Sequence, residues 1–122
     1  MQTREQEYGA SSESLAVSHL KKHGYKIIKR NYRTKIGEID IIAKDADTIV
    51  FIEVKARKSK AYSPKAAITR NKMRKISMVA LYYLKATRQL KAKARFDVVA
   101  IGSGNTVENI EIVKNAFELA YR

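Results

Sequence analysis

The sequence predicts a single α/β domain, covering residues 1–122, that is built around one sheet. Its 122 residues, 45% of them apolar, are enough to form one hydrophobic core. Two segments space their apolar residues at a helical period, and five others are short runs rich in β-branched residues. In chain order these segments give αβββαββ, which is typical of helices packed on one sheet.

The first helix is expected from about Ser11 to His23, because apolar residues recur there at helical spacing. Ser11 or Ser12 can cap its start, and Gly24 can end it. Residues 25–33 are then expected to form the first strand.

Residues 37–43 (GEIDIIA) and 48–55 (TIVFIEVK) are expected to form an antiparallel hairpin. Both runs are rich in β-branched residues, and a short polar link containing Asp45 and Asp47 separates them. A second helix is expected to start at Ser63-Pro64, with proline in the first helical position, and to continue to about residue 86. The remaining expected elements are a strand, a turn and a last strand, at residues 95–101 (RFDVVAI), 102–105 and 108–113.

Positive charge is concentrated in one third of the chain. The net charge is +13, and no acidic residue occurs from Val54 to Phe96. That segment nevertheless holds 14 basic residues, namely Lys55, Arg57, Lys58, Lys60, Lys65, Arg70, Lys72, Arg74, Lys75, Lys85, Arg88, Lys91, Lys93 and Arg95. Such a segment is typical of a nucleic-acid-binding surface. The alternatives are solvated charged faces without a partner and an anionic membrane surface.

The residues that are missing exclude several kinds of chemistry. Without cysteine there is no disulfide framework, thiolate zinc site or cysteine nucleophile. No apolar run approaches the roughly 18 residues of a spanning helix, and the first ten residues lack the apolar core of a signal peptide. We therefore expect a cytoplasmic protein that does not enter a membrane.

Charged residues on the hairpin are the first candidates for a functional site. Side chains alternate along a strand, so Glu53 and Lys55 point the same way, and the hairpin can bring Asp40 beside Glu53. Glu38 shares a face with Asp40. Two carboxylates with only oxygen donors suit Mg²⁺ or Mn²⁺. The alternative is an edge-strand salt bridge from Glu53 to Lys55 with Asp40 in solvent.

Two further charges fall on the apolar stripes of the expected helices. Glu13 lies on the inward stripe of the first helix, although an acid in a first turn also simply complements the helix dipole. Lys72 is four residues from both Ile68 and Ile76 and so belongs to the buried side of the second helix. A long lysine can alternatively reach solvent at the sheet edge. Several charges directed at one sheet face are costly unless they pair or bind a metal.

These residues match the pattern of a known group of enzymes. The string GEID (residues 37–40), twelve intervening residues and EVK (residues 53–55), with Glu13 in a preceding helix, resemble the PD-(D/E)XK nuclease superfamily. Within it the chain most resembles the YraN-like family of predicted endonucleases, related to archaeal Holliday-junction resolvases. The stretches that carry the resemblance are SESLAVSHLKKHGY, KRNYRTKIGEIDIIA, IVFIEVKAR, the helix from residue 64 and RFDVVAI, which together span nearly the whole chain. One departure is Ser11-Ser12 before Glu13, where the family usually shows a glycine nearby.

The resemblance implies a restriction-endonuclease-like fold, with a central mixed sheet flanked by helices, and a role for each candidate residue. Asp40 and Glu53 would bind Mg²⁺ or Mn²⁺, with the carbonyl of Val54 as a further ligand. Lys55 would orient or activate the attacking water. Glu13 would hold a metal-bound water or a second ion, and Lys72 would contact the scissile phosphate.

We therefore expect a metal-dependent endodeoxyribonuclease that acts on branched or otherwise structured DNA, and a homodimer is left open. Phosphate contacts are expected from Arg57, Lys58, Lys60, Arg70, Lys72 and Lys75. Tyr62 and Tyr82 can stack on unpaired bases, whereas Tyr83 is expected in the core. The alternatives are a non-catalytic DNA- or RNA-binding module on the same fold and a basic ribosome-associated protein. We discount His19 and His23 as surface residues.

Overall fold

The computed structural model describes residues 4–56, 68–102 and 110–118. The elements within these ranges are α1 (Arg4–Lys22), β1 (Lys26–Arg33), β2 (Glu38–Asp45), β3 (Thr48–Ala56), α2 (Arg70–Ala86), β4 (Ala94–Ile101) and β5 (Ile110–Phe117). Their order, αβββαββ, confirms the predicted α/β fold class. Neither described helix combines the length and the hydropathy that crossing a membrane requires.

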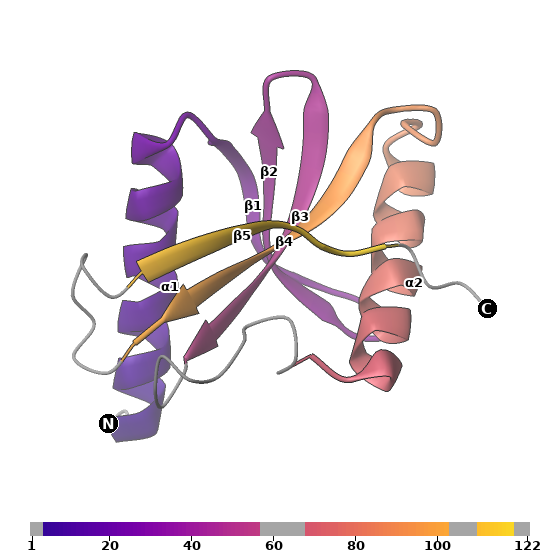
Figure 1. Ribbon diagram of the computed structural model, residues 1–122. Coiled ribbons are helices and arrows are strands. Elements are labelled where there is room, and N and C mark those ends of the chain that lie inside the picture. Colours follow the sequence, from indigo (N-terminus) through magenta and orange to yellow (C-terminus); the bar gives the residue numbers. More distant parts are fainter. Residues whose placement is uncertain (1–3, 57–67, 103–109, 119–122) are drawn as a thin grey trace.

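One five-stranded mixed sheet forms the centre of the molecule, in the spatial order β1-β2-β3-β4-β5. Only β3 and β4 pair in parallel, and α2 lies in the connection between them, as a parallel pair requires. The two helices stand on opposite sides of the twisted sheet (Figure 1). This arrangement, a central mixed sheet flanked by helices, is the one that the resemblance implied. It makes β3 a central strand, covered on both faces.

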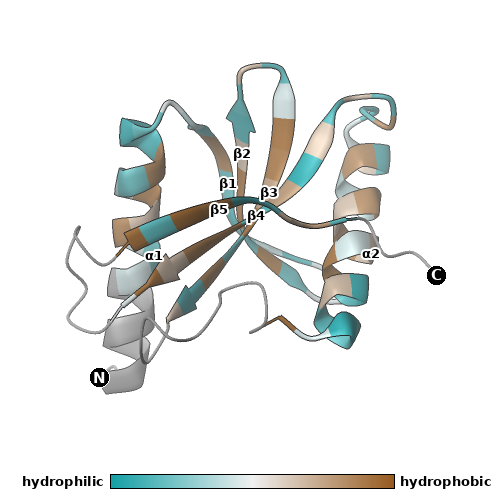
Figure 2. Ribbon diagram, viewed as in Figure 1, coloured by the Kyte–Doolittle hydropathy of each residue, from teal (hydrophilic) through white to brown (hydrophobic). Residues whose placement is uncertain are grey.

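Each helix encloses its own half of the core. Because side chains alternate along a strand, Val50 and Ile52 of β3 pack with the α1 cluster, whereas Ile49 and Phe51 pack with the α2 cluster. The neighbouring strands add further buried apolar residues, and Figure 2 shows the hydrophobic colour concentrated on the central strands. Two packed faces hold β3 in one register, because a slip by one residue would exchange the two sets.

Both helices begin at residues other than those predicted. Helix α1 starts at Arg4, so the caps predicted at Ser11 and Ser12 are wrong, and its upstream residues contain no proline that would stop a helix. Its predicted end is confirmed, because Gly24 follows with a φ of +88°.

Helix α2 starts at Arg70 instead of continuing from Pro64 through residue 68. Thr69 is extended and its side chain accepts a hydrogen bond from the backbone N–H of Lys72. Ile68 is buried outside the helix, in a small cluster with Val98 and Ala116. The predicted start at Ser63-Pro64 lies outside the described residues.

The strands match the prediction to within a few residues. Strand β5 continues to Phe117, beyond the predicted end at residue 113, because Ala116 and Phe117 pack against β4 and its surroundings. Of the turn predicted at residues 102–105, residues 103–105 lie outside the described residues, as does the predicted start of this strand.

A buried polar network joins three strands near the β2–β3 turn. The carboxylate of Asp97, fully buried, accepts hydrogen bonds from the Tyr25 hydroxyl at 2.8 Å, from Arg95 at 3.0 Å and from the backbone N–H of Asn115 at 3.1 Å. Arg95 also pairs with Asp45 at 2.7 Å. Burial and the neighbouring carboxylate of Asp97 raise the pKa of Tyr25 to about 12. The Tyr25 hydroxyl therefore keeps its proton, and its hydrogen bond to Asp97, over the physiological pH range.

Asp97→Ala is expected to destabilise the fold by about 3 kcal/mol, because it leaves the buried Tyr25 hydroxyl, the half-buried Arg95 guanidinium and the Asn115 N–H without their shared acceptor. Urea denaturation would measure the loss. Asp47→Ala, which removes an exposed ion pair with Lys93, serves as the control and should leave the unfolding midpoint nearly unchanged. Equal midpoints for the two variants would contradict this role of Asp97.

Candidate functional site

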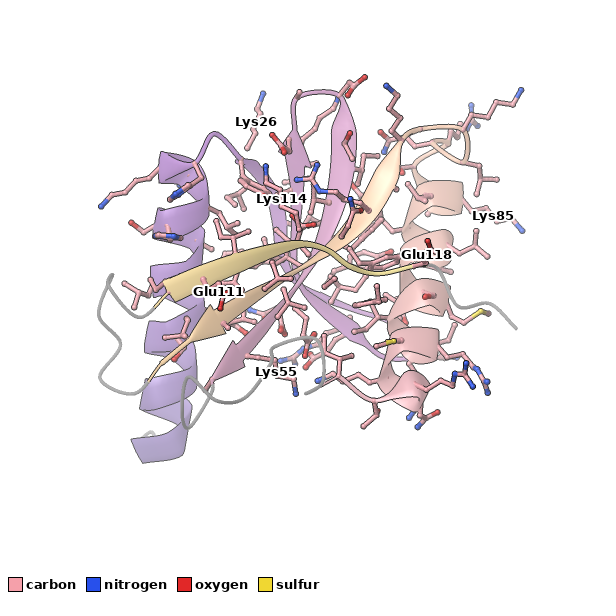
Figure 3. All side chains as sticks on the ribbon, viewed as in Figure 1. Lys26, Lys55, Lys85, Glu111, Lys114 and Glu118 are labelled. Carbon is pink, nitrogen blue, oxygen red and sulfur yellow. The ribbon has the colours of Figure 1, made fainter. Side chains whose placement is uncertain are left out.

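A cavity of about 410 Å³ collects the charged residues singled out in the sequence. It lies where β3 ends and α2 begins, and Lys55 marks this lower edge of the sheet in Figure 3. Two helices and two strands contribute its lining, which consists of Ser12, Glu13, Glu38, Asp40, Glu53, Val54, Lys55, Ala56 and Lys72. The structure thus brings Asp40, Glu53, Val54, Lys55, Glu13 and Lys72 to one place.

Asp40 and Glu53 meet through the register of the β2–β3 hairpin. Ile41 pairs with Ile52, so the next positions along the two strands are Asp40 and Glu53. Asp40 accepts a hydrogen bond from the backbone N–H of Val54 at 2.8 Å, and Glu53 is only 7% exposed. Burial and then the charge of Glu53 raise the pKa of Asp40 to about 7, against the opposing effect of the Val54 hydrogen bond. The two carboxylates therefore disfavour being ionised together in the absence of a cation.

Lys72 supplies a positive charge to this acidic pair. Its Nζ lies 2.5 Å from Oε1 of Glu53. Burial alone would lower the pKa of Lys72, but the hydrogen bond and charge of Glu53 raise it above its ordinary value. The Lys72 side chain is 41% exposed, but its ammonium is paired with a buried carboxylate. The edge-strand salt bridge from Glu53 to Lys55 is also wrong, because β3 is central and the ion pair is with Lys72.

Lys55 lies two residues beyond Glu53 at the end of β3 and is half-buried. Burial and then the neighbouring ammonium of Lys72 lower the pKa of Lys55, although Glu53 and Asp40 partly oppose the change. Lys55 therefore gives up its proton more readily than an ordinary lysine. The pKa values of the two lysines shift in opposite directions, and the ion pair with Glu53 is made by Lys72.

The remaining carboxylates of the cavity are peripheral. Glu13, half-buried on α1, is close enough for its charge to raise the pKa of Asp40 after larger contributions from burial and Glu53. Glu38 is exposed and pairs with Arg33 at 3.0 Å. Among the residues that the structure describes, Asp40 and Glu53 are not joined by a further histidine or acidic side chain in a three-residue metal cluster.

The donors present nevertheless fit a hard divalent cation. Asp40 and Glu53 offer only oxygen atoms, and an ion such as Mg²⁺ typically takes one or two protein carboxylates and completes its shell with water and substrate oxygens. Asp40 uses Oδ2 for the Val54 N–H and Glu53 uses Oε1 for Lys72, so each carboxylate keeps a second oxygen. The ion pair with Lys72 already places a positive charge against the Glu53 carboxylate.

The predicted DNA contacts divide between described and undescribed residues. Arg70 and Lys75 are exposed on α2, and Lys75 also lines a narrower cavity of about 120 Å³ together with Asp40, Glu53 and Lys72. Tyr82 is exposed and Tyr83 is buried, as predicted. Outside the described residues are Arg57, Lys58, Lys60 and Tyr62. His19 near the end of α1 and His23 just beyond it contact each other and do not line either cavity.

Sequence reasoning missed two features of the site. Ser12 lines the cavity beside Glu13, and no motif indicated it. The sequence placed Lys55 and Lys72 on one sheet face but did not indicate that the Lys72 ammonium lowers the pKa of Lys55, because this depends on how α2 packs across the end of β3. The one sequence signal for such a basic partner was Glu53 itself, because a buried carboxylate needs a positive charge beside it.

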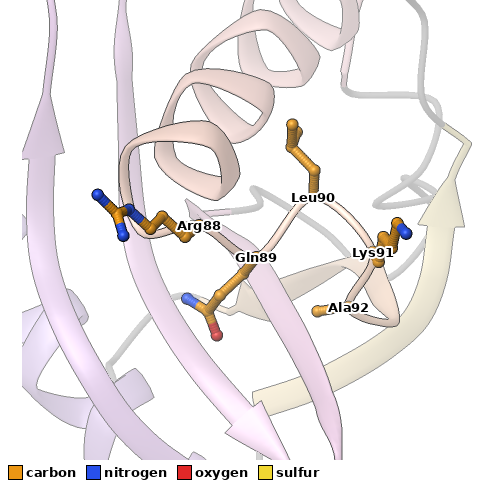
Figure 4. Close-up of a pocket in the computed structure, with 5 residues that line it drawn as sticks. All are labelled: Arg88, Gln89, Leu90, Lys91 and Ala92. Carbon is orange, nitrogen blue, oxygen red and sulfur yellow. The ribbon is translucent and has the colours of Figure 1, made fainter.

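A larger cavity lies elsewhere and carries different chemistry. Its volume is about 480 Å³, and it is lined by the segment after α2, residues 88–92 (Figure 4). Among these five lining residues are two basic side chains, Arg88 and Lys91, and no carboxylate, so its charge disfavours a divalent cation. Chemistry, not volume, therefore identifies the site at Asp40 and Glu53.

One solved structure resembles this one weakly. It is an "EndoMS-dsDNA2 complex", with a TM-score of 0.41 and 18% sequence identity, and the match covers 75% of this chain and 35% of that one.

Relatives similar to nearly the whole chain occur in several bacteria. A UPF0102 protein of Desulfosudis oleivorans is 52% identical over 97% of this chain and 95% of its own length. A UPF0102 protein of Geobacter metallireducens is 53% identical over 93% of each chain, and one of Caldicellulosiruptor saccharolyticus is 46% identical over 91% and 97%. Residues 12–101 match the model of the uncharacterised protein family UPF0102. The chain therefore belongs to UPF0102, the YraN family that its motifs resemble.

Proposed function

We propose that this protein is a Mg²⁺- or Mn²⁺-dependent endonuclease that hydrolyses phosphodiester bonds of branched or otherwise structured DNA. The observation that carries the proposal is the Asp40–Glu53 carboxylate pair at the end of a central strand, with Lys55 and Lys72 beside it. Phosphodiester hydrolysis needs a nucleophile at neutral pH and a positive group that stabilises the negative charge developing on the phosphate. This set of groups offers both.

A purely structural role explains the arrangement poorly. Two acids held close together inside a protein repel each other, and a fold that needed only stability would gain more from apolar side chains there. The network around Asp97 shows how this chain stabilises a buried acid, with three donors around one carboxylate. Around Asp40 the chain instead places a second acid, which supports binding of a cation between them.

Each residue has a separate part in the proposed reaction. Asp40 and Glu53 would hold the cation, which would supply positive charge to the phosphate and lower the pKa of bound water. Lys55, with its lowered pKa, would accept a hydrogen bond from the attacking water or take its proton. Lys72 would move its contact from Glu53 toward a phosphate oxygen, and Glu13 would hold a water at the cavity edge.

DNA is the proposed substrate because of the distribution of charge. Arg70 and Lys75 are exposed on the helix that carries Lys72, and the chain holds no acid between Val54 and Phe96. A polyanion would therefore meet basic residues on the approach to the carboxylates. The proposed preference for branched DNA comes from the likeness to junction resolvases.

The second candidate is a DNA- or RNA-binding module without catalysis. The observation that favours it is the Lys72–Glu53 ion pair, which already neutralises Glu53 without a metal. A cleavage panel of branched, flapped, single-stranded and duplex DNA, each with Mg²⁺ and with Mn²⁺, separates the two. Cutting of any member that requires the ion supports the nuclease, whereas binding without cutting across the whole panel supports the module.

Asp40→Asn is expected to abolish metal-dependent cleavage while leaving metal-free DNA affinity unchanged or higher, because it removes a negative charge that faces a polyanion. Asparagine keeps an oxygen for the Val54 N–H, so the local fold should persist. Nicking assays and fluorescence anisotropy with chelator would measure the two properties. Cleavage at the wild-type rate would rule out the assigned role of Asp40.

The raised pKa of Asp40 also predicts how the stability of the metal-free protein changes with pH. Folding raises its pKa from 3.8 to about 7, so the folded state loses stability as pH rises through that window, by about 4 kcal/mol at most. Asp40→Asn should therefore raise Tm above pH 7 and have little effect near pH 4. Added Mn²⁺ should raise the Tm of the wild type alone. A Tm difference that does not depend on pH would be inconsistent with the buried acid pair.

Lys72→Met is expected to lower cleavage roughly 100-fold or more, as loss of one charge-stabilising group does, while Mn²⁺ affinity stays equal or rises. The affinity should not fall because the variant removes a cation that competes for Glu53. Lys85→Met on the same helix, whose side chain points away from the site in Figure 3, serves as the control. Full activity of the Lys72 variant would leave only a structural role for its ion pair.

A further inference from the structure

An exposed surface of mixed apolar and aromatic character begins at the site. We call it the tyrosine strip and define it as Ile36, Lys75, Met78 and Tyr82. Tyr82 is 54% exposed, Ile36 45% and Met78 36%, so these are among the most exposed large apolar side chains of the described residues. The proposed catalytic steps use none of these three side chains.

Helical geometry and one close contact bring the strip together. Lys75, Met78 and Tyr82 are separated by three and four residues, and so they share one face of α2. The turn between β1 and β2 packs on the same helix, because Gly37 lies against Lys75 and Val79. The hydroxyl of Thr34 accepts hydrogen bonds from the backbone N–H groups of Ile36 and Gly37. This turn is therefore held beside α2, with Ile36 at its margin.

Tyr83, the neighbour of Tyr82 in the chain, belongs to a packed pair of aromatic rings. Tyr32 of β1 meets Tyr83 edge to face, with ring centroids 5.3 Å apart, and the ammonium of Lys29 lies 5.7 Å from the Tyr32 ring. Burial and then the neighbouring groups Tyr82 and Tyr83 raise the pKa of Tyr32. Tyr82 is thus an exposed ring next in the chain to Tyr83, whose own ring packs against Tyr32.

The strip is continuous with the proposed catalytic cavity. Lys75 is its first member, and the same residue lines the 120 Å³ cavity that contains Asp40, Glu53 and Lys72. A strand whose phosphate lay at Lys72 would meet Lys75 next and then Met78 and Tyr82 along the helix. Because α2 carries no acidic residue, nothing on that helix repels a phosphate chain on this path.

We propose that the tyrosine strip binds an unpaired DNA strand leaving the catalytic cavity, with Tyr82 stacking on a base and Lys75 contacting a phosphate. Exposed rings between basic side chains are the chemistry that recognises single strands, since every base has a face on which to stack. The bases of an intact duplex are already stacked and give Tyr82 no partner. The position of the strip relative to cleavage rests on the proposed function, whereas strand binding itself does not.

The test compares affinities of a fluorescent single-stranded DNA and a blunt duplex of the same sequence, in chelator so that no cleavage occurs. Tyr82→Ala should weaken single-strand binding about tenfold, within the range for loss of one stacked base, and change duplex binding less than twofold. Tyr82→Phe should bind like the wild type, because it keeps the ring. Leu90→Ala, an equally exposed apolar residue beyond the far end of α2, serves as the control and should have no effect.

Three results would overturn this inference. The first is equal single-strand affinity of Tyr82→Ala and the wild type. The second is equal weakening of single strand and duplex. The third is a wild-type dimer, seen by sedimentation, that Tyr82→Ala dissociates, because a second copy of the chain would then cover the strip. Absence of cleavage across the DNA panel, with the Tyr82 effect intact, would instead reject the proposed nuclease function and retain the strip.

Discussion

The close approach of the Asp40 and Glu53 carboxylates is the constraint on which the rest of the site depends. Two acids at this depth raise the pKa of Asp40 and require positive charge nearby. The chain meets that need with the Val54 N–H on one oxygen and the Lys72 ammonium on the other acid. Burial and then the nearby ammonium of Lys72 lower the pKa of Lys55. The shifted pKa values of Asp40, Lys55 and Lys72 thus all involve the charge and burial at this contact.

The fold makes this contact unavoidable. Strand β3 is packed on both faces, so its register against β2 cannot slip without burying the wrong residues. Near the other end of the hairpin, Arg95 binds both Asp45 and Asp97 and fastens β2 to β4. The site therefore lies on rigid strands. Its lysine partner comes from a helix whose start is set by the Thr69 cap, three residues before Lys72.

Much of this geometry follows from local patterns in the sequence. Alternation in GEIDIIA and TIVFIEVK predicted that Asp40 would face Glu53, and the helical period placed Lys72 on the buried side. The start of α2 was predicted wrongly because a serine-proline signal competes with a threonine cap six residues later, and local rules do not rank the two. The Asp97 network was not foreseen, since its partners come from distant segments that only the folded sheet brings together.

We propose that Asp40 and Glu53 together hold one divalent ion, which calorimetric titration with Mn²⁺ would detect. We expect one Mn²⁺ site in the wild type, lost in Glu53→Gln and retained in Glu38→Gln, because Glu38 lines the same cavity but is exposed and paired with Arg33. The Glu38 variant thus separates ligation from a general loss of negative charge. Equal loss of Mn²⁺ binding in both variants, or unchanged binding in Glu53→Gln, would contradict the claim.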